Sequence, residues 1–336
     1  MTTIHRITCP IPFPLKTVNC YYIHDACPTL IDSGVNSADS MACIAAGIRQ
    51  AGGRLQDVRR VILTHAHTDH AGLAGYLADT YGAEVFIHRL DYPKFISGDE
   101  SQNSLYFQRF KQFLNFCGVP EAEAQAQTEA FEGRVCKLVA PLAAPQLLSG
   151  GETFTFDDFE IQVVPTPGHS AGLISLFNAA DGTLFSGDFL LEHITPNPVA
   201  EFSLPAASND YGSLARFTSS LQWLLRQDVV QVRPGHGSSF GHARQRATAI
   251  LDHFKRRRRQ VIRLMAREQA GLPADQGVPL AQLVRHMFPG LKEMAVFLGL
   301  SEAYAYFQRL ESESLLESWR ELGVAYYRLK SGALSE

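Results

Sequence analysis

The chain has 336 residues, of which 46% are hydrophobic and 19% charged, and its formal net charge is −4. This apolar content is enough for a large core without disulfide staples, and the charge gives no global reason to expect a nucleic-acid or anionic-membrane partner. No stretch approaches the roughly 18 apolar residues of a membrane-spanning helix, and no basic start followed by a long apolar run marks a signal peptide. We therefore expect a cytoplasmic globular protein that does not bind membranes.

The first third of the chain reads as short strands that alternate with helices. β-prone segments with turn residues between them predict strands, and residues 38–51 and 72–81 predict helices. The expected strands cover residues 4–8, 20–24, 29–31, 58–64 and 84–88. Strands that alternate with helices along the chain predict an α/β layered fold.

Residues 89–145 interrupt this alternation. Tyr106, Phe110, Phe113 and Cys117 fall at helical spacing, which predicts a helical insertion. The remaining elements expected in this part of the chain are strands at 153–156, 160–165, 173–178 and 183–186, a helix at 211–226 and a strand at 229–233.

The character of the chain changes near residue 243, where glycine becomes sparse and the strongest basic run begins. The expected elements are a long helix at 243–270, helices after Pro279, at 291–299 and at 301–316, and a short strand at 324–329. Helices closed by a small β element suggest a winged-helix type of module. We therefore expect a catalytic domain at residues 1–242 and a mainly helical, winged-helix-like domain at residues 243–336.

The most informative segment is Thr64-His65-Ala66-His67-Thr68-Asp69-His70, which directly follows an apolar strand. Histidines and an aspartate in so short a stretch are costly to bury unless they share a partner, and both side-chain types suit zinc. Alternate side chains of an extended segment share a face, so His65 and His67 can bind one ion. A turn into the next helix would direct Asp69 and His70 toward a second ion.

Further ligand-type residues stand at the ends of other expected strands. His169, Asp188 and His236 each follow such a strand, and each lies beside a glycine that permits close backbone approach. In α/β sheets, ligands usually bind at the carboxyl ends of the strands. Together with the first segment, these residues form a suitable set for two metal ions that share one carboxylate.

In this order, the residues resemble the H-x-H-x-D-H box, later histidine, bridging aspartate and final G-H of the metallo-β-lactamase-fold hydrolase superfamily. The resemblance covers roughly residues 5–240 and implies an αββα sandwich. It implies that one metal ion is bound by His65, His67 and His169, and the other by Asp69, His70 and His236. Asp188 would bridge the two ions. Asp32, in a D-x-G element, would orient ligating residues without binding a metal ion itself.

The metal residues and the resemblance together predict hydrolysis. Two zinc ions, for which iron or manganese could substitute, would lower the pKa of a bridging water to about 7. The resulting hydroxide would attack a carbonyl or phosphoryl centre. Asp69 is expected to act as the catalytic residue that orients the nucleophile or carries a proton, in addition to binding metal. A metal-binding regulatory protein without activity is an alternative that the intact ligand set disfavours.

A small acyl compound is the first expectation for the substrate. Residues 187–197 resemble a stretch of the glyoxalase II-like subgroup with a C-terminal winged-helix extension, and that subgroup includes acyl-thioester hydrolases. The sequence therefore favours hydrolysis of a thioester or related acyl ester. Tyr106 and Phe110 are candidates for an apolar acyl pocket, although simple packing of their helix is the favoured explanation. His193 is a candidate to approach the substrate.

An endoribonuclease or phosphodiesterase with the same metal site is the alternative, because the subgroup also includes some endoribonucleases. Its main support is the basic segment 244–267, which holds nine Lys/Arg residues and one acid. Most residues of such a run on a helix would face solvent, so a nucleic-acid partner is less favoured than a small molecule. The resemblance also allows a homodimer, because the C-terminal module contributes to dimerisation in that subgroup.

Overall fold

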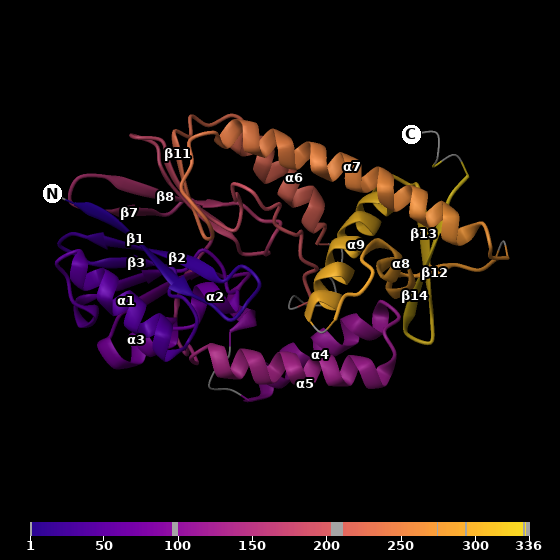
Figure 1. The fold of residues 1–336 in the computed structure, drawn as a ribbon, viewed down its shortest axis with the longest axis horizontal. Helices are drawn as coiled ribbons and strands as arrows, with labels where there is room; N and C mark the ends of the chain where they lie inside the picture. Colours follow the sequence, from indigo (N-terminus) through magenta and orange to yellow (C-terminus); the bar gives the residue numbers. More distant parts are fainter. Residues whose placement is uncertain are drawn as a thin grey trace.

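The computed structural model describes residues 2–95, 100–202, 211–273, 275–292, 294–331 and 333. Within these ranges, two β-sheets face each other and helices cover their outer sides, as Figure 1 shows. The expected αββα sandwich is therefore confirmed. No helix of the described residues combines the length and the apolar character needed to cross a membrane.

In the described part of the chain, the first sheet has six strands in the order β1-β2-β3-β4-β5-β6, and the second has five in the order β11-β10-β9-β8-β7. The first sheet consists of β1 Thr3–Pro10, β2 Thr17–His24, β3 Thr29–Ile31, β4 Arg60–Ile62, β5 Glu84–His88 and β6 Gln146–Leu148. The second sheet consists of β7 Thr153–Thr155, β8 Glu160–Pro165, β9 Ile174–Asn178, β10 Thr183–Gly187 and β11 Gln231–Pro234.

The directions of the strands bring several chain turns to one edge of the sandwich. β3, β4, β5 and β6 run parallel to one another in the first sheet. In the second sheet β10 is parallel to β11, and β8 has the same direction because both β8 and β10 are antiparallel to β9. The carboxyl ends of parallel strands meet at one edge, so turns after β4, β8, β10 and β11 can converge there.

Helices on each outer face complete the layers. The first sheet is covered by α1 Ala38–Gln50, α2 Thr68–Ala71 and α3 Ala74–Tyr81, and the second by α6 Ser213–Leu224 and α7 Ala243–Gln269. Local signals explain where some of them begin and end. The Ser37 hydroxyl accepts a hydrogen bond from the Ser40 backbone N–H and caps α1, whereas α3 ends at Gly82 in the left-handed conformation.

The predicted insertion contains two long helices, α4 Glu100–Phe116 and α5 Glu121–Leu138. Figure 1 shows them below the rest of the molecule, beside the C-terminal helices. α4 packs on α9, which spans Met294–Ser312, through ring contacts of Phe110 with Phe297 at 5.0 Å and of Phe113 with Tyr304 at 5.6 Å. The aromatic stripe of the sequence is therefore a helix-packing surface.

The C-terminal part holds α7, α8 Leu280–Met287, α9 and a small sheet in the order β12-β14-β13, with β12 Val278–Pro279, β13 Leu316–Glu321 and β14 Val324–Leu329. The prediction of separate helices at 291–299 and 301–316 was wrong, because α9 runs through both. Gly299 lies inside α9, and its lack of a side chain leaves room for Leu291, because a Cβ there would lie 2.7 Å from Leu291 Cδ1. The domain boundary and the winged-helix assignment stay predictions.

Candidate metal centre

The segment from His65 to His70 changes conformation halfway. His67 has extended backbone, with φ −66° and ψ 147°, and immediately precedes α2. His65 and His67 therefore lie on one side of an extended stretch, and Asp69 and His70 lie in the first helical turn. This change of conformation directs the two pairs of side chains to two neighbouring positions.

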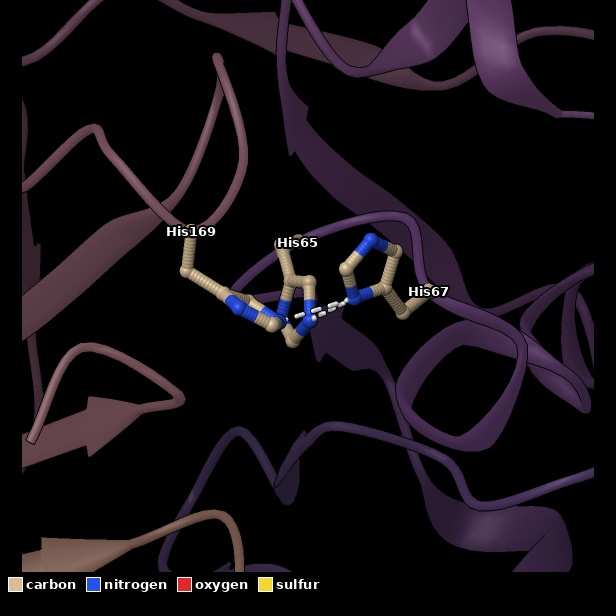
Figure 2. A group of neighbouring side chains, drawn as sticks. All are labelled: His65, His67 and His169. Carbon is tan, nitrogen blue, oxygen red and sulfur yellow. Dashed lines mark hydrogen bonds between the residues drawn. The ribbon is translucent and has the colours of Figure 1, made fainter. Parts of the chain in front are cut away.

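His65, His67 and His169 form the first of these positions, and we call them the three-histidine group. His65 Nε2 and His169 Nε2 each lie 3.0 Å from His67 Nδ1, as Figure 2 shows. Ligands of a tetrahedral zinc ion with bonds of 2.0–2.1 Å are separated by about 3.3 Å. The three nitrogens thus have nearly the spacing that one zinc ion requires.

Asp69, His70, Asp188 and His236 form the second position, the carboxylate group. His236 Nε2 lies 3.4 Å from Asp69 Oδ2 and 3.5 Å from Asp188 Oδ2. The other carboxylate oxygen of Asp188 lies 3.5 Å from His70 Nε2. Asp188 Oδ2 is also 3.5 Å from His169 Nε2, so this residue contacts both groups.

Several ligand atoms of the carboxylate group are buried without a hydrogen-bond partner among the described residues. These atoms are His70 Nε2, Asp188 Oδ1 and His236 Nε2. An unsatisfied buried polar atom costs about 1–3 kcal/mol, and a metal ion would satisfy all three at once. The residues of this group therefore fit a divalent cation, as the spacing of the three-histidine group also does.

The opposite ring nitrogens of the histidines are held by acceptors. His70 Nδ1 donates to Asp32 Oδ2 at 2.8 Å, His169 Nδ1 to the Asn197 carbonyl at 3.0 Å and His236 Nδ1 to the Thr17 carbonyl at 2.6 Å. An acceptor on one nitrogen fixes the proton there and leaves the lone pair of the other nitrogen for metal binding. In these three histidines the proton is therefore on Nδ1, and Nε2 is left to bind a metal ion.

Burial dominates the electrostatics of the three-histidine group. It lowers the pKa of His67 to about 3, helped by the neighbouring charges of His169 and Lys94. Burial also lowers the pKa of His65 and of His169, and the charges of neighbouring histidines add to this effect. All three side chains are consequently neutral, which is the form that binds metal ions.

Charge dominates in the carboxylate group. Burial opposes protonation of His236, but the neighbouring carboxylates of Asp188 and Asp69 outweigh it and raise the pKa of His236 to about 10. The pKa of His70 is raised for the same reason, against burial, by Asp188 and Asp32. Because it is buried and holds two carboxylates, this group attracts positive charge strongly.

Asp32 lies where the resemblance implied a supporting residue. Its carboxylate accepts hydrogen bonds from the Thr64 backbone N–H at 2.8 Å and from His70 Nδ1, and its side chain is buried. Its φ of 57° is rare for a residue other than glycine, and such strain persists where the surroundings hold it in place. Gly235 also serves the site, because a Cβ there would lie 2.6 Å from Asp188 Oδ1.

Sequence reasoning missed two sets of residues that hold the ligand loops. Asn19 Nδ2 donates to the carbonyls of Pro234 and Gly237 at 3.0 and 2.8 Å, on either side of His236. Asp91 accepts a hydrogen bond at 2.9 Å from the backbone N–H of Ala66. An asparagine within the apolar strand β2 was a usable signal, because a buried amide needs specific partners.

The three pocket candidates have different surroundings. Phe110 is fully buried, with ring contacts to Phe131 and Phe297. Tyr106 is partly buried and stacks on Phe202 at 5.2 Å. The His193 side chain is 84% exposed, with Nε2 3.2 Å from a Glu192 carboxylate oxygen. Their role in substrate binding stays a prediction.

Comparison with known families and structures agrees with this geometry. The family model of the metallo-beta-lactamase superfamily matches residues 14–237, which include every residue of both ligand groups. A metallo-beta-lactamase family protein from Thermus thermophilus has the same fold, with a TM-score of 0.79 at 24% identity over 97% of this chain and 98% of that chain.

Two curated relatives are also similar. The probable metallo-hydrolase YqjP of Bacillus subtilis is 27% identical over 98% of this chain and 99% of its own length. The hydroxyacylglutathione hydrolase of Brucella ovis is 30% identical over 137 residues, which make up 40% of this chain and 49% of that protein. Similarity to the first spans the whole chain, and similarity to the second spans about half of the relative.

Proposed function

This chain belongs to the metallo-beta-lactamase superfamily, and we propose that it uses two zinc ions to hydrolyse acyl thioesters or related acyl esters. The observation that carries the proposal is the convergence of seven ligand-type side chains, from both sheets, on two adjoining positions. Similarity along the entire chain to a probable metallo-hydrolase supports the reaction class.

The ligand groups suggest how two cations would be held. The three-histidine group would bind one, Asp69, His70 and His236 the other, and Asp188 would lie between them. Nitrogen and carboxylate donors at these spacings suit zinc, with iron or manganese as substitutes. When bound, such a pair acidifies water and polarises a substrate carbonyl.

The protein's own contribution is to position the ligands and to handle a proton. Asp69 has the most exposed carboxylate of its group, with 15% of the side chain accessible compared with 9% for Asp188. Burial opposes its ionisation, but the charges of His70 and His236 keep the pKa of Asp69 below its usual value. The ionised Asp69 would therefore orient a water molecule by accepting its hydrogen bond, consistent with its predicted catalytic role.

Support for a thioester comes from the relative whose name states that activity. Hydroxyacylglutathione hydrolases cleave a thioester, and the matched region amounts to 40% of this chain. The match leaves about half of that relative uncovered, so the glutathione part of its substrate is not carried over. We therefore propose the thioester bond as the target and leave the thiol component open.

A panel assay tests this proposal. The zinc-loaded protein would be incubated with acyl thioesters of different thiols, oxygen esters, lactones and phosphodiesters, and product release would be measured. We expect the highest kcat/KM for a thioester and loss of that activity in His67→Ala. Turnover of phosphodiesters alone, with no acyl compound cleaved, would refute the proposal.

A second candidate function is cleavage of RNA, and the surface of α7 favours it. Arg256, Arg259, Arg263 and Arg267 are exposed, lie three or four residues apart and line one groove along the helix. They form no ion pair with an acid among the described residues. The intervening Arg257, in contrast, pairs with Glu302 at 2.8 Å. A row of such arginines about 16 Å long would suit a phosphate backbone.

A variant with all four arginines changed to glutamine tests this surface. If RNA binds there, labelled single-stranded RNA should bind with a log affinity that falls about 0.7 per contacted phosphate per log unit of salt, and the variant should lose most of that slope. The matched control changes Arg49, Arg89, Arg226 and Arg285, which are exposed elsewhere. An equal loss of salt dependence in both variants would show that RNA binding depends on net charge, and would exclude this surface as an RNA-binding site.

A further inference from the structure

Asp91 lies in the turn after β5, outside every motif of the sequence, and its side chain is fully buried. Its carboxylate accepts a hydrogen bond from the backbone N–H of Ala66 at 2.9 Å, between His65 and His67. It also accepts hydrogen bonds from the Ser170 hydroxyl and, at 2.7 Å, from the Gly172 backbone N–H. One carboxylate is therefore bonded to two loops that carry ligands.

These two loops come from different sheets. The loop of Ala66 follows β4 of the first sheet, whereas Ser170 and Gly172 follow His169, beyond β8 of the second sheet. The three-histidine group is divided in the same way, with His169 opposite the other two. Its geometry depends on how the loops are held together, and Asp91 bonds directly to both.

Lys94 neutralises this buried carboxylate. Its ammonium lies 2.8 Å from Asp91 Oδ1, 2.8 Å from the Ser170 hydroxyl and 2.7 Å from Glu201 Oε2, and only 10% of its side chain is exposed. A buried carboxylate without a counter-ion would be strongly destabilising. Lys94 supplies this counter-ion and bonds to the His169 loop as well.

Gly172 shows how closely the loop approaches Asp91. A Cβ on this residue would lie 2.7 Å from the Asp91 nitrogen and 2.8 Å from its Cβ, closer than side-chain atoms pack. Only glycine permits this approach. The close contact therefore depends on residues of both loops. A shift of either loop would break several hydrogen bonds at once.

We propose that Asp91, with Lys94 as its counter-ion, is a positioning residue that sets the spacing of His65, His67 and His169. Asp32 differs from it in that its bonds to Thr64 and His70 stay within the segment after β4. Asp91 instead joins the two sheets at the metal centre. The inference rests on the proposed two-metal centre but not on the identity of the substrate.

Metal titration of Asp91→Asn tests this role. The amide keeps the size of the side chain but loses the charge and one acceptor. We expect one of the two ions to bind about 10- to 100-fold more weakly, as is typical when a residue behind a ligand is changed. Competition with a chromophoric chelator would measure affinity, and the visible spectrum of bound Co²⁺ would report the altered histidine geometry.

The matched control is Glu302→Gln. Glu302 is also a buried carboxylate in an ion pair, 2.8 Å from Arg257, but it joins α7 to α9 in the C-terminal part. This variant should lower the free energy of unfolding while leaving both metal affinities unchanged. An equal loss of metal affinity in the control would assign the effect to general destabilisation and overturn the proposal.

Ser170→Ala keeps the proposal testable if Asp91→Asn does not fold. Removing this hydroxyl breaks one bond to Asp91 and should weaken the same ion by a smaller factor. Wild-type affinity and Co²⁺ spectrum in whichever variant folds would overturn the proposal. If the wild type binds two ions but cleaves no thioester, the proposed substrate fails while the role of Asp91 is still measured.

Discussion

In the three-histidine group burial lowers the pKa of every imidazole, whereas in the carboxylate group Asp188 raises the pKa of the histidines that it faces. The two groups adjoin and share Asp188 as a contact, yet one is neutral and the other is rich in negative charge. In the proposed two-metal centre, this difference would give the two positions different preferences for metal ions. Neutral nitrogen donors favour zinc, and added carboxylates tolerate harder cations.

The largest effect is expected from Asp188→Ala, because this residue contacts both groups. The variant should lose affinity for both ions, whereas His67→Ala should lose affinity for one. Loss of a metal ion removes several kcal/mol of transition-state stabilisation, so kcat/KM should fall roughly 10³-fold or more in each. Metal analysis together with kinetics would check this. Identical metal content in the two variants would contradict the division into two groups.

Removal of the metal ions should lower stability as well as activity. The carboxylate group holds buried carboxylates and orphaned ligand atoms that the cations would satisfy. An ion present at about 1,000 times its Kd stabilises the folded state by about 4 kcal/mol. Urea unfolding with and without chelator would measure the difference, and stepwise chelation would show which group empties first. An unchanged unfolding midpoint would count against resident metal ions.

Asp32→Asn should act on the carboxylate group alone. Asparagine tolerates the left-handed backbone at this position, so the change mainly removes the charge that faces His70. We expect about 10- to 100-fold weaker binding of one ion. Comparison with Asp91→Asn sharpens the contrast, because the two variants should weaken different ions. Weakening of the same ion by both would contradict separate positioning.

The smallest effect is expected from metal exchange. In a mixture of zinc and manganese, manganese should enter the carboxylate group first, because carboxylate oxygen suits it better than imidazole nitrogen does. Activity should change least if the ion proposed for the three-histidine group is not exchanged. The electron paramagnetic resonance spectrum of bound Mn²⁺, with total metal analysis, would identify the position. A random distribution of the two metals over the two groups would contradict the predicted difference in metal preference.

The candidate ligand residues, which the structure brings together, could be predicted from the sequence because each stands in a recognisable place. His65 to His70 follow an apolar strand, and His169, Asp188 and His236 follow other strands beside glycines. The alternation of strands and helices predicted an α/β layered fold, and the family resemblance implied the αββα sandwich. Asp91 carries no such signal, because two of the groups that it bonds are the backbone N–H groups of Ala66 and Gly172, which are 25 and 81 residues away. Backbone donors look alike at every position in a sequence.

The aromatic stripe of α4 is a second feature that the sequence predicted only in part. Periodicity correctly indicated a helical insertion with one apolar face, but it could not identify what that face contacts. Phe110 and Phe113 pack against α9, almost two hundred residues further along the chain. The prediction likewise divided the region of α9 into two helices, whereas the structure has a single helix over residues 294–312.

Residue type and local pattern by themselves determined the strands, most helices and the chemistry of the ligands, because these depend on neighbours within a few positions. Only the tertiary structure decided which nitrogens are free, which carboxylate contacts both ligand groups and which acids hold the loops. Those properties depend on distances between segments far apart in the chain. They also depend on burial, because the electrostatic effect of a charge is stronger where water is excluded.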